Sequence, residues 1–99
     1  MTRIEARLLA VKYVEAIERE SGIELILLDD ITIERAFGWV FFYDSKRHQE
    51  TGDFSDVIAG NAPIVVTRVD GRLHVTGTAY PVEHYLKPFD HYKPSDPGQ

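Results

Sequence analysis

An α+β fold is predicted by three observations: a helical period of apolar residues near the N-terminus, a change to the two-residue period of strands at Ile23, and turn signals through the second half. We expect an N-terminal helix packed on an antiparallel sheet of about four strands, with a short helical turn before the third strand and a short C-terminal helix. The 99 residues suit one domain. We place it at 1–93 and expect a flexible tail at 94–99, which has nothing to bury.

The N-terminal helix is predicted by a capping box and by apolar spacing. Thr2 and Glu5 stand three residues apart, the spacing with which each side chain can bond the other's backbone N–H. We expect the helix to run to about Glu20 and to stop at Gly22, which takes the left-handed C-terminal position at little cost. Its apolar residues recur at steps of three and four, with two alanines between them: Ile4, Leu8, Val11, Val14 and Ile17, and Ala6 and Ala10.

Strands are predicted after Gly22. From Ile23 to Glu34 apolar and polar residues alternate, but Asp29 falls on the apolar side. The ladder therefore either bulges at Asp29-Asp30 or breaks into two short strands there, and the sequence leaves both open. The run at 39–43 has apolar residues at both parities, which is typical of a strand covered on both faces. We expect it to be the best-buried strand.

The second half is punctuated by glycine and proline. Asp53 is a good N-cap for a helical turn over Phe54 to Ala59, and Asn61-Ala62-Pro63 then redirects the chain. Strands at 64–67 and 73–76 are joined by the Asp70-Gly71 turn and should pair as a hairpin. Finally, Pro81 opens a short helix that Pro88 is expected to end after about two turns.

The charge pattern bounds the partners. The net charge is −5, and residues 24–56 hold eight acids against three cations, which accounts for the whole surplus. An acidic middle repels phosphates, so we expect no nucleic-acid partner, and a basic protein face is the complementary one. Eight charges in the first twenty residues argue against a signal peptide or a membrane span. The absence of cysteine fits a reducing compartment, and we expect the cytoplasm.

Motifs for catalysis are weak. His48, Glu50 and Asp53 could be imagined as metal ligands, but they lie in a predicted loop without a second histidine at ligand spacing. Ser45-Lys46 has no oxyanion-hole motif after it, and neighbouring residues on a strand point opposite ways. We therefore predict no enzyme, no metal and no cofactor.

Several of these segments together resemble the immunity protein 35 family of bacterial polymorphic toxin systems. The most specific element is the combination of Gly52-Asp53 with Gly60-Asn61-Ala62-Pro63 before an apolar strand. The resemblance spans roughly Gly38 to Leu86 and departs from the family pattern at His48 and Gln49, where an aromatic and an aliphatic residue are usual. The remaining segments that carry it are Gly38-Trp39-Val40-Phe41-Phe42-Tyr43, Ser45, Glu50-Thr51, Ala59, Asp70-Gly71, Gly77-Thr78, Pro81 and Tyr85.

The resemblance implies a small α+β protein that is encoded beside a toxin, neutralises it by binding, and carries no chemistry of its own. It does not identify the toxin. The candidate partner-binding residues are the acids near the end of the first strand and those around the glycine-bounded loop, together with one histidine: Asp29, Asp30, Glu34, His48, Glu50, Asp53 and Asp56.

The alternative is a general holdase that engages unfolded chains through an exposed apolar patch. A dedicated inhibitor should bind one folded partner at defined stoichiometry, whereas a holdase should protect several unrelated clients. An exposed edge on the first strand leaves both a monomer and a homodimer open.

Overall fold

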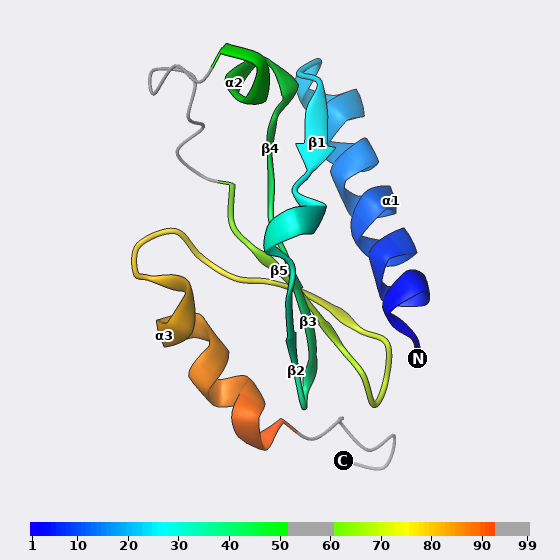
Figure 1. Cartoon of the computed structure of the whole chain (residues 1–99), viewed down its shortest axis with the longest axis vertical. Coiled ribbons are helices and arrows are strands. Elements are labelled where there is room, and N and C mark those ends of the chain that lie inside the picture. The colour runs from blue at the N-terminus through cyan, green and yellow to red at the C-terminus, as the bar shows by residue number, and fades with distance from the viewer. Residues whose placement is uncertain (52–60, 93–99) are drawn as a thin grey trace.

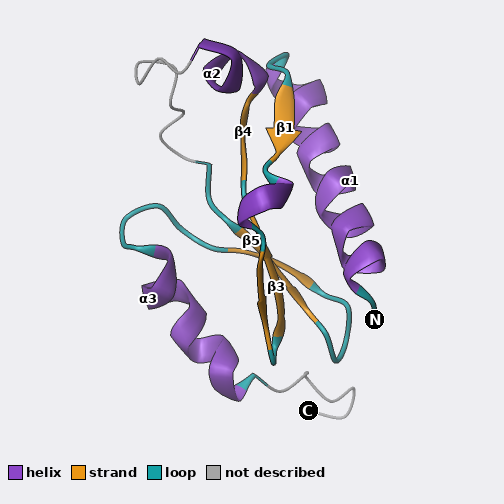
Figure 2. Ribbon diagram, in the orientation of Figure 1, coloured by secondary structure: helices purple, strands orange, loops and turns teal. Residues whose placement is uncertain are grey.

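The computed structural model describes residues 1–51 and 61–92. The helical turn predicted at Phe54 to Ala59, the acids Asp53 and Asp56, and the tail at 94–99 lie outside them. The described chain is α+β, as predicted (Figures 1 and 2). Its elements are α1 (Arg3–Ser21), β1 (Leu25–Leu27), the 3-10 helix η1 (Asp29–Ile31), β2 (Ile33–Arg35), β3 (Gly38–Phe41), β4 (Tyr43–Ser45), α2 (Lys46–Thr51), β5 (Ile64–Thr67), β6 (Leu73–Val75), α3 (Val82–Leu86) and the 3-10 helix η3 (Lys87–His91).

The strands form two antiparallel sheets. Strands β2, β3, β5 and β6 make a four-stranded sheet in that order, and β1 pairs with β4 in a two-stranded one. Helix α1 covers one face, while α3 and η3 cover the opposite face of the four-stranded sheet (Figure 1). The predicted sheet of about four strands is therefore confirmed, with the short β1–β4 pair added beside it.

The N-terminal helix has the predicted ends but a different buried face. Ala6 and Ala10 are fully buried and Val14 nearly so, whereas Ile4 is 74% and Leu8 53% exposed. Placing Ile4 and Leu8 on the buried face was therefore wrong. A row of small side chains at a spacing of four lets the helix approach the sheet closely. The larger apolar residues have the same helical period on the neighbouring face, so the period alone does not tell which face is buried.

The caps of α1 are those that the sequence indicates. Thr2 and Glu5 form the reciprocal capping box, in which each side chain accepts a hydrogen bond from the other's backbone N–H. At the other end Gly22 has φ 71°, and its N–H donates to the carbonyl of Glu18.

The alternation from Ile23 to Glu34 breaks into two strands at Asp29-Asp30, which settles the question that the sequence left open. The N–H of Leu28 donates to the carbonyl of Phe42, and Ile33 faces Val40. Between these two contacts the chain advances five residues, from Leu28 to Ile33, while its pairing partner changes by only two, from Phe42 to Val40. Three residues are therefore in excess. That excess is the length of η1, so the 3-10 turn accommodates the extra residues between two separately paired strands.

Strand β3 is buried on both faces, as predicted for the run at 39–43. That run does not form a single strand, however, because β3 ends at Phe41 and Tyr43 begins β4 of the two-stranded sheet. Trp39 and Phe41 pack with Ile64 on the α1 side, and Val40 packs with Leu86 on the α3 side. All five side chains are at most 1% exposed. Large residues at both parities of this strand therefore serve the core.

Two helical segments differ from the prediction. Residues 46–51, expected as a loop, form α2, whose N-cap is the Ser45 hydroxyl that accepts the N–H of His48 at 3.0 Å. The C-terminal α-helix α3 ends at Leu86, just before Pro88, as predicted, but a 3-10 helix that was not predicted follows it directly. Pro88 lies in the first turn of η3, where its missing N–H costs no bond, and η3 continues to His91.

Candidate partner-binding surface

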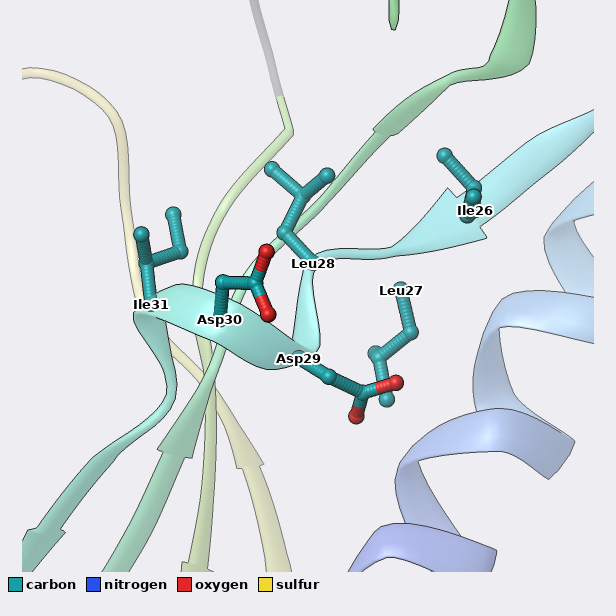
Figure 3. Close-up of a pocket in the computed structure, with 6 residues that line it drawn as sticks. All are labelled: Ile26, Leu27, Leu28, Asp29, Asp30 and Ile31. Atoms are coloured by element: carbon teal, nitrogen blue, oxygen red, sulfur yellow. The ribbon is translucent and has the colours of Figure 1, made fainter.

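Two adjoining depressions flank the break between β1 and β2. One of about 470 Å³ is lined by residues 26–31 (Figure 3), and one of about 340 Å³ lies between α1 and β1. They share Ile26, Leu27 and Asp29 as lining residues. The 3-10 turn that breaks the ladder therefore shapes the surface on both of its sides.

Asp29 fastens η1 to α1. The guanidinium of Arg7 donates two hydrogen bonds to its carboxylate, from Nε to Oδ1 at 2.8 Å and from Nη2 to Oδ2 at 2.9 Å. These bonds lower the pKa of Asp29, against a smaller opposing effect of burial, and they raise the pKa of Arg7. In Figure 3 the Asp29 carboxylate points toward α1. The negative charge of Asp29 is thus largely offset within the protein.

Asp30 and its apolar neighbours face the first depression. The Asp30 carboxylate lies between Leu28 and Ile31 in Figure 3 and makes no hydrogen bond or ion pair with any residue in the described ranges. Ile26 is 42% and Ile31 52% exposed, and both line the same depression. The arrangement combines a carboxylate with exposed aliphatic surface, which suits a ligand group that is cationic at its end and apolar along its stem.

Glu34 serves a different local structure. Its Oε1 accepts the indole N–H of Trp39 at 3.0 Å, and its Oε2 lies 3.5 Å from Nη2 of Arg68. The Arg68 guanidinium in turn lies over the Trp39 ring, 4.3 Å from the ring centroid. Glu34 therefore holds the side chains at the edge of β2 and β3 and does not line either depression.

His48 points into a polar cluster at the junction of β4 and α2. Its Nδ1 contacts Oδ2 of Asp44, four residues earlier on the chain. Asp44 and Ser45 are buried, and Asn61 donates to Oδ1 of Asp44 at 3.4 Å and to the carbonyl of Tyr43 at 3.3 Å. The cluster ties the start of α2 to the strand before it, and the role of His48 toward a partner stays a prediction.

The structure therefore separates the predicted site residues. Asp29 and Asp30 lie together at the strand break, Glu34 lies on β2, and His48 and Glu50 lie on α2 with the Glu50 side chain exposed. Asp53 and Asp56 lie outside the described residues.

Sequence reasoning missed the apolar lining of the depressions and the acids of α1 beside them, Glu15 and Glu18, because their proximity depends on how α1 lies against β1. It also missed Asp44 and Asn61, although the four-residue spacing of Asp44 and His48 was a usable signal.

A second polar network pins the C-terminal segment to the β5–β6 hairpin. Asp70 accepts hydrogen bonds from the Thr67 hydroxyl, from the Tyr92 hydroxyl at 2.6 Å and from the N–H of Arg72 at 3.2 Å. Burial alone would raise the pKa of Asp70, but these bonds outweigh it and lower the pKa. The ring of His74 packs edge-on against Tyr92, and burial lowers the pKa of its imidazole. This network is a structural fastening.

No group of three or more histidine, aspartate or glutamate side chains in 1–51 and 61–92 could hold a metal ion. No helix in the same ranges has the length and apolar character needed to cross a membrane.

Comparisons with known proteins give a family and one relative. A family model described as Immunity protein 35 matches residues 4–88, most of the chain. A protein of Escherichia coli (strain K12), described as "Uncharacterized protein YrhB", is 39% identical over 62 residues. The match covers 61% of this chain and 66% of the relative, slightly less than two thirds of its length. No solved structure matches the chain significantly.

Proposed function

The chain belongs to the immunity protein 35 family, and from that premise we propose that it binds and neutralises a cognate bacterial toxin in a stoichiometric complex. The family match over residues 4–88 is the observation that carries the proposal. The chain acts by covering a toxin surface that is needed for activity, or by blocking a motion that the toxin requires. The proposal assigns it no catalytic step and no cofactor, and it places the complex in the cytoplasm.

The physical basis of binding is a small number of desolvated anchors within a charged rim. The acidic surplus in residues 24–56 favours a toxin with a basic face, because opposite charges speed the encounter and disfavour wrong partners. The same surplus disfavours nucleic acid as a ligand. The described acids Asp29, Asp30, Glu34 and Glu50 are exposed, and the charges of Asp29 and Glu34 are partly offset by Arg7 and Arg68.

Co-expression with the product of the adjoining reading frame tests the proposal. That protein is produced alone, with this chain, and with an empty vector, while viability is followed. We expect growth to fail when the neighbour is produced alone and to recover only with this chain, and we expect the two proteins to co-purify at a fixed ratio. A toxic neighbour that this chain neither binds nor counteracts would contradict the proposal.

A second candidate is a holdase, which would bind unfolded chains through exposed apolar side chains. Ile4 is 74%, Val69 65% and Tyr80 60% exposed, and they lie on different parts of the chain. A holdase should suppress the aggregation of several unrelated denatured proteins at similar ratios, without forming a defined complex with a folded one. Light scattering of two heat-denatured model proteins in the presence of this chain separates the two functions.

A further inference from the structure

We propose that the strand break at η1 is the point at which the toxin docks, and that it receives a lysine or arginine side chain of the toxin flanked by aliphatic residues. The inference rests on the proposed function and names the surface and the chemistry of the contact. Its centre is Asp30 with the exposed side chains of Ile26 and Ile31.

The charge of the two depressions favours a cation. Their acidic lining residues are Glu15 and Glu18 from α1 and Asp29 and Asp30 from η1, against the lining cation Arg7 and the nearby Arg3, whose charge acts on Asp29. Both hydrogen bonds of the Arg7 guanidinium go to the Asp29 carboxylate. The Glu18 carboxylate already accepts a hydrogen bond from the N–H of Leu25 at 2.9 Å. Asp30 has no hydrogen-bond or ion-pair partner in the described ranges. An incoming ammonium or guanidinium group therefore meets an uncompensated carboxylate in a negative surrounding.

The apolar surface around Asp30 contacts the apolar stem of that cationic side chain. Ile26 and Ile31 expose 42% and 52% of their surface on the depression, with Leu28 between them in sequence. A lysine or arginine stem can bury its methylene groups against these side chains while its charged end reaches the carboxylate. Loss of water from the isoleucines provides affinity, and the ion pair fixes the orientation.

Docking through side chains is favoured over addition of a strand. At the two ends of the β1–β4 pair, the carbonyl of Glu24 accepts the N–H of Lys46, and the N–H of Leu28 donates to the carbonyl of Phe42. Leu25 has the other parity, so its N–H points away from β4. That N–H is bound by Glu18, and α1 packs beside β1. The outer edge of β1 is therefore covered where an added strand would need it free.

Binding of the purified chain to the toxic product of the adjoining reading frame tests the inference, with paired variants. Asp30→Lys reverses the charge at the proposed contact, and Asp90→Lys makes the same change on an exposed aspartate in the other 3-10 helix, η3. Ile31→Ser removes apolar surface from the depression, and Val69→Ser does so at a 65% exposed valine outside it. Circular dichroism and urea unfolding verify that each variant is folded.

We expect Asp30→Lys and Ile31→Ser each to weaken binding by about tenfold or more, and the two controls to stay within about threefold of the unmodified chain. Added salt should slow association of the unmodified chain more than that of Asp30→Lys. A complex that forms normally but is insensitive to Asp30→Lys would overturn this inference alone. Failure of the unmodified chain to bind or protect would overturn the proposed function and this inference with it, and tighter binding to a nucleic acid probe would do the same.

Discussion

Replacing Gly38 with alanine should be among the most destabilising single changes in this protein. Gly38 is the first residue of β3 and lies opposite Thr67 of β5, and β3 and β5 are the two central strands of the four-stranded sheet. Its φ is +148°, a conformation that residues with a side chain rarely adopt. A Cβ atom there would lie 2.0 Å from the carbonyl oxygen of Val66 and 3.0 Å from the backbone nitrogen of Arg68.

The expected loss follows from these two effects. A sparsely populated backbone conformation costs about 1–3 kcal/mol, and crowding that forces the backbone to shift costs about another 1–3 kcal/mol. Because the atom that is met is a backbone carbonyl, no side-chain rotation can relieve the contact. We therefore expect Gly38→Ala to lower the free energy of unfolding by about 4 kcal/mol, out of a total of about 5–15 kcal/mol for a domain of this size.

Urea unfolding followed by tryptophan fluorescence measures this loss, since Trp39 is buried beside the substituted position. Gly22→Ala is the matched control, because Gly22 also has a positive φ, of +71°, but a Cβ there would meet nothing within 4 Å. It should cost only about 1–2 kcal/mol, the penalty of the left-handed conformation. A loss in Gly38→Ala no larger than that in Gly22→Ala would refute the reasoning from the contact with β5.

Three further outcomes are expected. Ala10→Leu should lower the free energy of unfolding by about 1–3 kcal/mol, because Ala10 is buried and the larger side chain overpacks the core. Leu8→Ala should change it by less than about 0.5 kcal/mol, because Leu8 is exposed. Equal effects of the two variants in urea unfolding would contradict the observed orientation of α1. A double-mutant cycle on Arg7 and Asp29 should give a coupling free energy of only about 0.2–1 kcal/mol, because both side chains are about half exposed. A value near 3 kcal/mol would show that exposure does not weaken the ion pair. His74 has a lowered pKa in the folded protein, so its contribution to stability is present above about pH 6.5 and is lost as the pH falls toward the folded pKa. His74→Gln should flatten the decline in stability between pH 7 and pH 5, and an unchanged slope would count against this account.

The parts of the fold that could be predicted from the sequence are those set by local chemistry. The capping box at Thr2, the stop at Gly22 and the doubly buried strand after Gly38 each follow from a few neighbouring residues. The buried face of α1 could not be predicted, because the alanine row and the larger aliphatic row have the same helical period. Only the close approach of the helix to the sheet selects the alanines.

The candidate surface could be predicted only in part. The charge pattern and the irregular alternation already pointed to Asp29 and Asp30. The sequence could not tell that Arg7 would take up the charge of Asp29 and leave that of Asp30 open, since that distinction depends on the placement of α1 against η1. Glu34 was predicted with them because it is near in sequence. It lies on β2, beyond η1, where its carboxylate accepts the indole N–H of Trp39.

The backbone hydrogen bonds within η1 are local, from the N–H of Ile31 to the carbonyl of Leu28 and from that of Thr32 to the carbonyl of Asp29, and both flanking ladders are paired through backbone groups outside η1. Side-chain changes in this segment should therefore cost folding little, so that the proposed docking point can be varied while the scaffold beneath stays the same.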